Sequence, residues 1–175
     1  SLGLVGSEMC IRDRLDICNA KVNDSCGFHV HMDAAGFNLD TWKNLTLTYK
    51  HLEHLIDAFM PRTRRNNTYC KTLSGVSDER IKSVRTIDGL REVFNNDRYH
   101  KVNFEAYSRH RTVEFRQHSG TTNFTKMENW IRFLNGLITF AKRSSLPSRM
   151  TLEELPFLDG KQKLFFKLRT KKLAV

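Results

Sequence analysis

The chain has 175 residues, a formal net charge of +10 at pH 7, and 39% hydrophobic against 27% charged residues. This length supports a single hydrophobic core, and no apolar run approaches the length that crosses a membrane, so no membrane partner is expected. The basic balance favours an anionic partner, which could be nucleotide phosphates, nucleic acid or an acidic substrate.

The first fourteen residues do not resemble part of a native fold. Residues 4–14 resemble the translated end of a transposon-derived sequencing adapter, and they lack the basic start and continuous apolar region of a secretory signal. We therefore expect residues 1–14 not to be native, residues 15–150 to form one domain, and residues 151–175 to be a helical, basic extension. On this interpretation the chain is an N-terminal truncation.

Cysteine usage favours a reducing compartment. Once Cys10 is set aside with the foreign segment, Cys18, Cys26 and Cys70 remain. An odd, widely spaced set of cysteines argues against a disulfide framework. We therefore expect a cytoplasmic protein.

Residues 26–33 alternate apolar and polar side chains with period two, the pattern of a strand with one buried face. The apolar face consists of Phe28, Val30 and Met32. The polar face consists of His29, His31 and Asp33. A strand that displays imidazoles and a carboxylate on its free face is a candidate for binding chemistry.

The next segment is expected to be helical. Asp40 is the expected N-cap of a helix over residues 42–59, where apolar residues recur at spacings of three and four. The polar stretch 62–83 is interpreted as a loop. Thr86 is placed to cap a short helix over residues 87–94.

A hairpin is predicted next. Residues 102–107 alternate in polarity, residues 108–111 are expected to turn, and residues 112–118 return as a strand. On the returning strand Val113 and Phe115 form the apolar pair. The opposite face carries Glu114, Arg116 and His118. This strand therefore also offers a polar face.

The last predicted elements are helices. Residues 125–128 fit a capping box that opens a helix over residues 127–141, and residues 152–173 indicate one or two weaker helical pieces with a basic tail. The element order favours an α+β fold, with an open antiparallel sheet and helices packed on one face. The other sheet face is then free for chemistry.

The polar residues of the two long strands suit a metal and an anion together. His29 and His31 should point the same way, about 6–7 Å apart, and so could share one ion or divide between an ion and its ligand. Glu114 offers a hard oxygen suited to Mg²⁺ or Mn²⁺, and Arg116 offers a planar fork for a phosphate. Each pair alone is also typical of a solvated strand face, but their combination favours a site.

Further candidates lie outside these strands. Arg64 and Arg65 are either part of a solvated basic loop or phosphate contacts in a loop over the site. Asn103 and Glu105, on the polar face of the hairpin, either line the pocket or form a cross-strand pair.

Four ordered segments resemble blocks of the putative amidoligase family, whose members are relatives of glutamine synthetase and glutamate–cysteine ligase within the carboxylate–amine ligase superfamily. These segments are residues 26–31, 64–70, 99–103 and 112–121. The resemblance covers about residues 20–140 and implies a partial glutamine-synthetase-like catalytic fold. It implies ATP-dependent coupling of a carboxylate, on a small molecule or a peptide, to an amine through an acyl phosphate, with two or more Mg²⁺ (or Mn²⁺) ions.

The resemblance also implies roles for single residues. His29 would be a metal ligand, and His31 would contact nucleotide phosphate or metal. Glu114 would be a second metal ligand, and Arg116 would neutralise charge on the γ-phosphate during transfer. The family places acidic metal ligands on an early strand that would lie upstream of residue 1 here, so we expect this fragment to be inactive.

Two other functions stay open at this point. The first is a zinc-dependent hydrolase or nuclease. Its tetrahedral site would use Cys26, His29 and His31, completed by His118 or Glu114. The second is a basic nucleic-acid-binding module, which rests on net charge alone.

Overall fold

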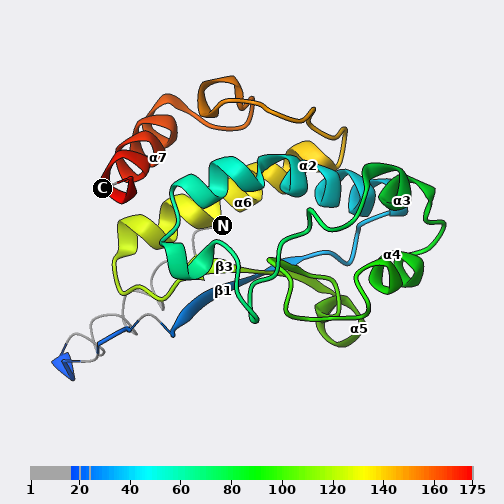
Figure 1. Cartoon of the computed structure of the whole chain (residues 1–175), viewed down its shortest axis with the longest axis horizontal. Coiled ribbons are helices and arrows are strands. Elements are labelled where there is room, and N and C mark those ends of the chain that lie inside the picture. Colours follow the sequence, from blue (N-terminus) through cyan, green and yellow to red (C-terminus); the bar gives the residue numbers. More distant parts are fainter. Residues whose placement is uncertain (1–16, 20, 24, 175) are drawn as a thin grey trace.

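The computed structural model describes residues 17–19, 21–23 and 25–174. The segment expected to be foreign, residues 1–14, lies outside these ranges. The described part is an α+β fold in which a three-stranded antiparallel sheet carries helices on one face, which confirms the predicted class (Figure 1). Within this part, no helix combines the length and apolar character needed to cross a membrane.

The sheet has the strand order β1-β3-β2. It consists of β1 (Gly27–Asp33), β3 (Thr112–Ser119) and the short β2 (Val102–Asn103). Glu114 on the central strand pairs with His31 on one side and with Asn103 on the other. Because paired residues of antiparallel strands project to the same face, the register alone gathers these three polar side chains.

The pairing of β1 with β3 is interrupted by a bulge. Phe28 pairs with His118, but Val30 pairs with Phe115, so one residue of β1 stands opposite two residues of β3. A bulge of this kind reverses the alternation of side chains beyond it. His118 therefore leaves the polar face that Glu114 and Arg116 share.

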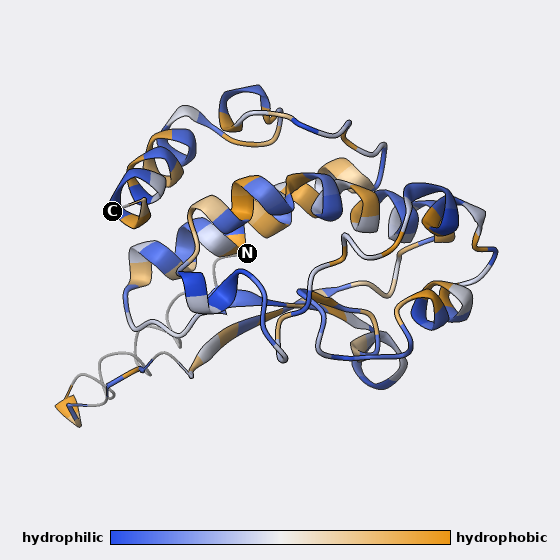
Figure 2. Ribbon diagram, viewed as in Figure 1, coloured by the Kyte–Doolittle hydropathy of each residue, from blue (hydrophilic) through white to orange (hydrophobic). Residues whose placement is uncertain are grey.

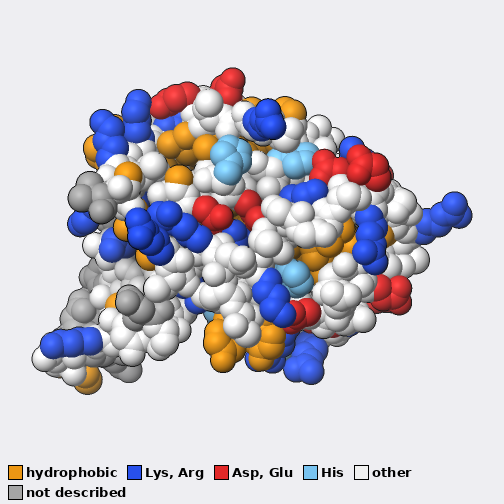
Figure 3. All heavy atoms as spheres, viewed as in Figure 1, with side chains coloured by type: hydrophobic (Ala, Val, Ile, Leu, Met, Phe, Trp, Pro, Cys, Tyr) orange, Lys and Arg blue, Asp and Glu red, His pale blue; other side chains and the backbone are white. Residues whose placement is uncertain are grey.

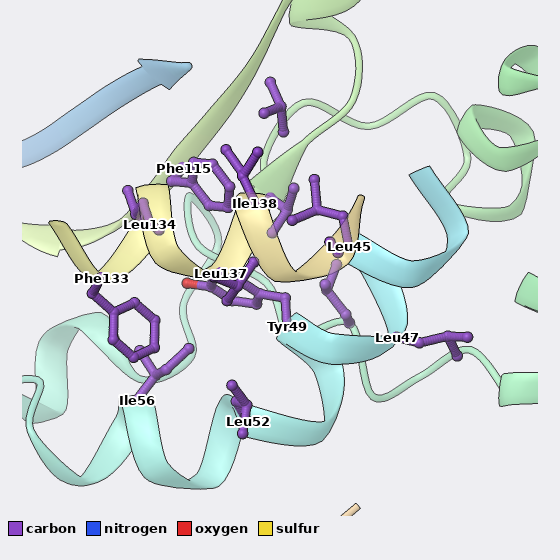
Figure 4. Close-up of a cluster of buried hydrophobic side chains, with 14 of the residues drawn as sticks. Leu45, Leu47, Tyr49, Leu52, Ile56, Phe115, Phe133, Leu134, Leu137 and Ile138 are labelled. Atoms are coloured by element: carbon purple, nitrogen blue, oxygen red, sulfur yellow. The ribbon is translucent and has the colours of Figure 1, made fainter. Parts of the chain in front are cut away.

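Two long helices, α2 (Leu39–Ala58) and α6 (Phe124–Ala141), lie side by side over the apolar face of the sheet (Figure 1). Their apolar stripes meet Phe115 of β3 in the core (Figure 4). Residues of both stripes are fully inaccessible to solvent. Among them are Leu52, Ile56, Trp130 and Leu134, each 0% exposed.

The helix α7 (Gly160–Leu173) forms an outer layer. It is largely hydrophilic in Figure 2, but Phe166 lies against the rings of Phe59 and Phe133, and Arg169 donates to the Phe59 carbonyl at 2.8 Å. The helical pieces expected over residues 152–173 are thus confirmed. The remaining short elements are η1 (Arg62–Arg64), α3 (Asp78–Ser83), α4 (Ile87–Val93), α5 (Ala106–His110) and η2 (Leu152–Glu154).

Two helix starts differ from their predicted positions. The N-cap of α2 is Asn38 rather than Asp40, and the N-cap of α6 is Asn123 rather than Thr125. In each case the asparagine side chain accepts a hydrogen bond from the backbone N–H three residues later. Several capping residues follow one another in both segments, so composition alone does not select among them.

Two segments expected to be irregular or extended are helical. Residues 62–83 contain η1 and α3, the latter capped by Ser77. The expected hairpin turn is replaced by α5, because the Asn103 side chain accepts from Glu105 N at 2.9 Å and ends β2 after two residues. Arg111, in the left-handed region at φ 56°, then leads the chain into β3.

Basic side chains are spread over the face shown in Figure 3, interspersed with acidic ones. On that face they form no continuous stripe. The excess charge of the chain is therefore not by itself an indication of a nucleic-acid groove there.

The layered core predicts a contrast between two leucines. Leu137 in α6 is 0% exposed, whereas Leu168 in α7 is 57% exposed. Leu137→Ala should lower the free energy of unfolding by about 2–5 kcal/mol, because it removes buried contacts and leaves a cavity. Leu168→Ala should change it by no more than about 0.5 kcal/mol. Urea denaturation of both variants checks this, and equal effects would contradict the layer arrangement.

Candidate functional site

The Glu114 carboxylate is the centre of the polar sheet face. Its Oε1 accepts from Arg116 Nη1 at 2.7 Å and lies 3.0 Å from His29 Nδ1, and its Oε2 accepts from Asn103 Nδ2 at 2.5 Å. His31 Nε2 is 3.8 Å from Oε1. The expectation that His29, His31, Glu114 and Arg116 share one face is confirmed.

These groups differ in how open they are to solvent. The side chains of Glu114 and Arg116 are 7% and 9% exposed, whereas those of His29 and His31 are 35% and 44% exposed. The His31 ring is oriented by a hydrogen bond of 2.9 Å between its Nδ1 and Thr112 Oγ1. The buried pair thus forms the floor of the site, and the imidazoles stand at its surface.

The environment of Glu114 keeps it ionised. Burial by itself would raise the pKa of this carboxyl, but hydrogen bonds from His29 and Asn103 and the charge of Arg116 lower it to about 2. At neutral pH Glu114 is therefore a fixed negative charge and a poor proton acceptor.

A cavity of about 630 Å³ opens over this face of the sheet. Its lining residues come from β1, β2, β3, α4, α5 and the segments between them. They are His29, His31, Arg91, Asn96, Arg98, Asn103, Glu105, Ala106, Ser108, Arg109, His110, Glu114 and Arg116. The volume suits a ligand of the size of a nucleotide or a small substrate.

The cavity carries an excess of positive charge. Glu105 is held by both Arg91 Nε, at 2.8 Å, and Arg91 Nη2, at 2.5 Å. With Glu114 paired to Arg116, both carboxylates in the lining are already neutralised. Arg98 and Arg109 have no carboxylate of the described residues within 4.0 Å, so their charges are available to an anion.

Three residues of this lining, Arg98, Arg109 and His110, were not predicted from the sequence as site residues. Arg98 precedes one of the four motif segments, and Arg109 and His110 lie in the segment that was interpreted as a turn. The run of charged residues from 108 to 111 was a usable signal. The face to which these side chains project depends on α5, and no capping pattern in the sequence predicts that helix.

Arg64 and Arg65 do not line the cavity. The Arg64 guanidinium donates to the carbonyl oxygens of Arg116 and Gln117 at the bulge, and Arg65 Nε donates to Met60 O at 3.1 Å. Arg64 is 4% exposed, so its role here is to satisfy backbone acceptors that the bulge leaves without strand partners. In the described residues both side chains are thus engaged with backbone carbonyls, and their contact with phosphate stays a prediction.

Close packing at this end of the site also explains a glycine. A Cβ atom at Gly27 would lie 2.7 Å from His29 Nε2 and 3.0 Å from Arg64 Nη2. A larger residue there would require the end of the His29 or the Arg64 side chain to shift. The glycine of the Cys26-Gly27-Phe28-His29 motif therefore leaves room for the imidazole that contacts Glu114.

His118 faces the helix layer instead of the cavity. It is 3% exposed, and its ring lies 5.7 Å from the rings of both Phe28 and Trp130. Burial lowers the pKa of His118 to about 4 despite its hydrogen bond to Ser119 O. The expectation that it extends the polar face is wrong because of the bulge, and a zinc site completed by His118 is excluded by the same geometry.

The described residues do not form a metal site in which the protein supplies all of the ligands. They contain no group of three or more His, Cys, Asp or Glu side chains placed to hold an ion. Glu114 and the two imidazoles supply one hard oxygen and two nitrogens, with Arg116 competing for the same oxygen. This set fits an ion that takes most of its ligands from a bound phosphate, as Mg²⁺ commonly does.

The pKa of Glu114 predicts how acid affects stability. Its folded pKa of about 2 lies below the ordinary 4.5, so its ionised form stabilises the fold above pH 4.5, and this contribution is lost as the pH falls toward 2. The difference in unfolding free energy between the wild type and Glu114→Gln should therefore be largest above pH 4.5 and shrink toward pH 2. Urea denaturation across this range measures it, and a difference independent of pH would contradict the assignment.

Comparison with known proteins gives one match. The model of the family described as putative amidoligase enzyme matches residues 9–138, about three quarters of the chain, and this range includes β1, β3 and the whole cavity lining. The match begins inside the segment expected to be foreign, which the described residues do not include. No curated protein and no solved structure matches. The chain belongs to the amidoligase family that this model describes.

Proposed function

We propose that this chain carries the site of an ATP-dependent carboxylate–amine ligase that works through an acyl phosphate. Family membership supports the formation of amide bonds. The observation that carries the rest is the cavity over Glu114, in which each carboxylate is already paired with an arginine and two further arginines are left for an anion.

In the proposed reaction, a carboxylate oxygen of the substrate attacks the γ-phosphorus of ATP and ADP leaves. The amine then attacks the acyl carbon, the bond between that carbon and the phosphate oxygen breaks, and inorganic phosphate leaves together with one proton of the amine, which completes the amide. Phosphoryl transfer of this kind depends mainly on positioning and charge neutralisation. Arg116 is suited to this role because Glu114 and the Tyr99 ring fix its guanidinium at the cavity floor.

The negative charge of the phosphates would be shared between the floor and the wall of the cavity. Arg116 belongs to the buried floor, and Arg98 contacts the same Tyr99 ring, with its guanidinium carbon 5.1 Å from the ring centre. Arg109 and His110 reach the cavity from α5. This arrangement supports a polyphosphate, since several cations surround one space.

A divalent metal would be held by Glu114, with His29 and His31 beside it. When bound, such an ion supplies charge neutralisation between phosphate oxygens. Because the pKa of Glu114 lies near 2, the carboxylate is ionised at neutral pH, as a metal ligand must be, and is unsuited to removing a proton from the amine.

The proposal predicts how Arg116 acts. The full chain should bind Mg·ATP, and Arg116→Ala should keep that affinity within a few-fold. In a form of the protein that also carries the acidic metal ligands expected upstream of residue 1, the same substitution should lower phosphoryl transfer about 100-fold, because the guanidinium acts on charge that develops during transfer. Titration calorimetry measures binding, and phosphate release in the presence of candidate carboxylates measures transfer.

The matched control is Arg132→Ala on α6, whose side chain is 62% exposed and lies outside the cavity lining. It should change neither quantity. Absence of Mg·ATP binding by the wild type would overturn the proposed function. Wild-type turnover in Arg116→Ala would overturn the role of Arg116 alone.

A further inference from the structure

An exposed tyrosine, Tyr69, lies beside the Tyr99 ring, which Arg98 and Arg116 of the cavity lining both contact. Tyr69 is 61% exposed, although the residue that follows it, Cys70, is 0% exposed. The Tyr69 ring lies edge-on to the Tyr99 ring, with 5.5 Å between centroids and an interplanar angle of 80°. One face of an aromatic ring is therefore presented to solvent beside a second, partly buried ring.

The turn that carries Tyr69 is built to hold it in place. Asn67 and Cys70 form a bridge, in which Cys70 N donates to Asn67 O at 3.1 Å. The Asn67 side chain accepts from Tyr69 N at 2.7 Å and donates to Thr63 O at 2.5 Å. These bonds fix the backbone at Tyr69, so the exposure of its ring is a property of a defined turn.

The same turn is tied to the floor of the site. Arg116 Nε donates to Tyr69 O at 3.4 Å, and the Arg116 guanidinium carbon lies 5.6 Å from the centre of the Tyr99 ring. The segment after the turn is joined to the Tyr99 segment by hydrogen bonds from Lys71 N to Tyr99 O and from Lys101 N to Lys71 O. Tyr69 is therefore held one ring away from the arginine that would contact phosphate.

We propose that Tyr69 is the stacking surface for the base of the nucleotide whose phosphates lie in the cavity. This inference rests on the proposed function and adds a base subsite to it. A flat aromatic face gains from stacking on a base, whereas the phosphates need the cations that Arg98 and Arg116 supply. The Tyr69 ring and these two cations all contact Tyr99, in the contact sequence ring, ring, arginine, and a nucleoside triphosphate has its base and its phosphates in the same order.

The test compares two ligands, Mg·ATP and Mg·tripolyphosphate, by titration calorimetry on the full chain. They share the phosphate chain and differ in the nucleoside. The wild type should bind Mg·ATP about tenfold or more tightly than Mg·tripolyphosphate, in line with the energy of one base stack. Tyr69→Ala should remove that difference and leave tripolyphosphate affinity unchanged, which also shows that the variant is folded.

Two further variants separate the ring from the turn. Tyr69→Phe should keep the preference for Mg·ATP, because stacking needs the ring and not the hydroxyl. Thr68→Ala, at an exposed position of the same turn, should bind both ligands as the wild type does.

The remaining outcomes each decide the question. Equal affinity of the wild type for both ligands, or an unchanged preference in Tyr69→Ala, would overturn the base subsite and leave the proposed function standing. Failure of the wild type to bind either ligand would overturn both.

Discussion

The burial of one negative charge organises this molecule. A carboxylate as enclosed as that of Glu114 is costly unless it is paired and hydrogen-bonded. Its partners come from all three strands, with His29 on β1, Asn103 on β2 and Arg116 on β3 itself. The short sheet is thus held together on one side by the apolar helix layer and on the other by the contacts of this carboxylate.

The bulge in β3 divides the strand between two purposes. Glu114, before the bulge, and Arg116, within it, face the cavity, while Gln117, the other bulge residue, contacts the helix layer through a 2.7 Å hydrogen bond from Tyr49. Beyond it, His118 packs among aromatic rings. The bulge leaves backbone carbonyls without strand partners, which would be unfavourable in a buried position. The buried Arg64 guanidinium donates hydrogen bonds to these carbonyls and so satisfies them.

The cavity combines paired and unpaired charges in a way that suits an anionic ligand. Neutralised carboxylates can orient a ligand or hold a shared metal, and the remaining arginines supply attraction. The walls come from α5 and from the segments before β2, whereas the floor comes from the sheet. A rigid floor under a wall of connecting segments is a common way to fix reacting groups while leaving room to vary the substrate.

The sequence by itself determined the phase of β1 and of the first half of β3, and with it the common face of His29, His31, Glu114 and Arg116. It also determined the apolar stripes of both long helices, because these features depend only on periods of two and 3.6 residues. Only the tertiary structure decided the face of His118, the backbone contacts of Arg64 and the helical form of residues 106–110. These depend on the pairing register and on side chains distant in sequence, and local periodicity contains neither.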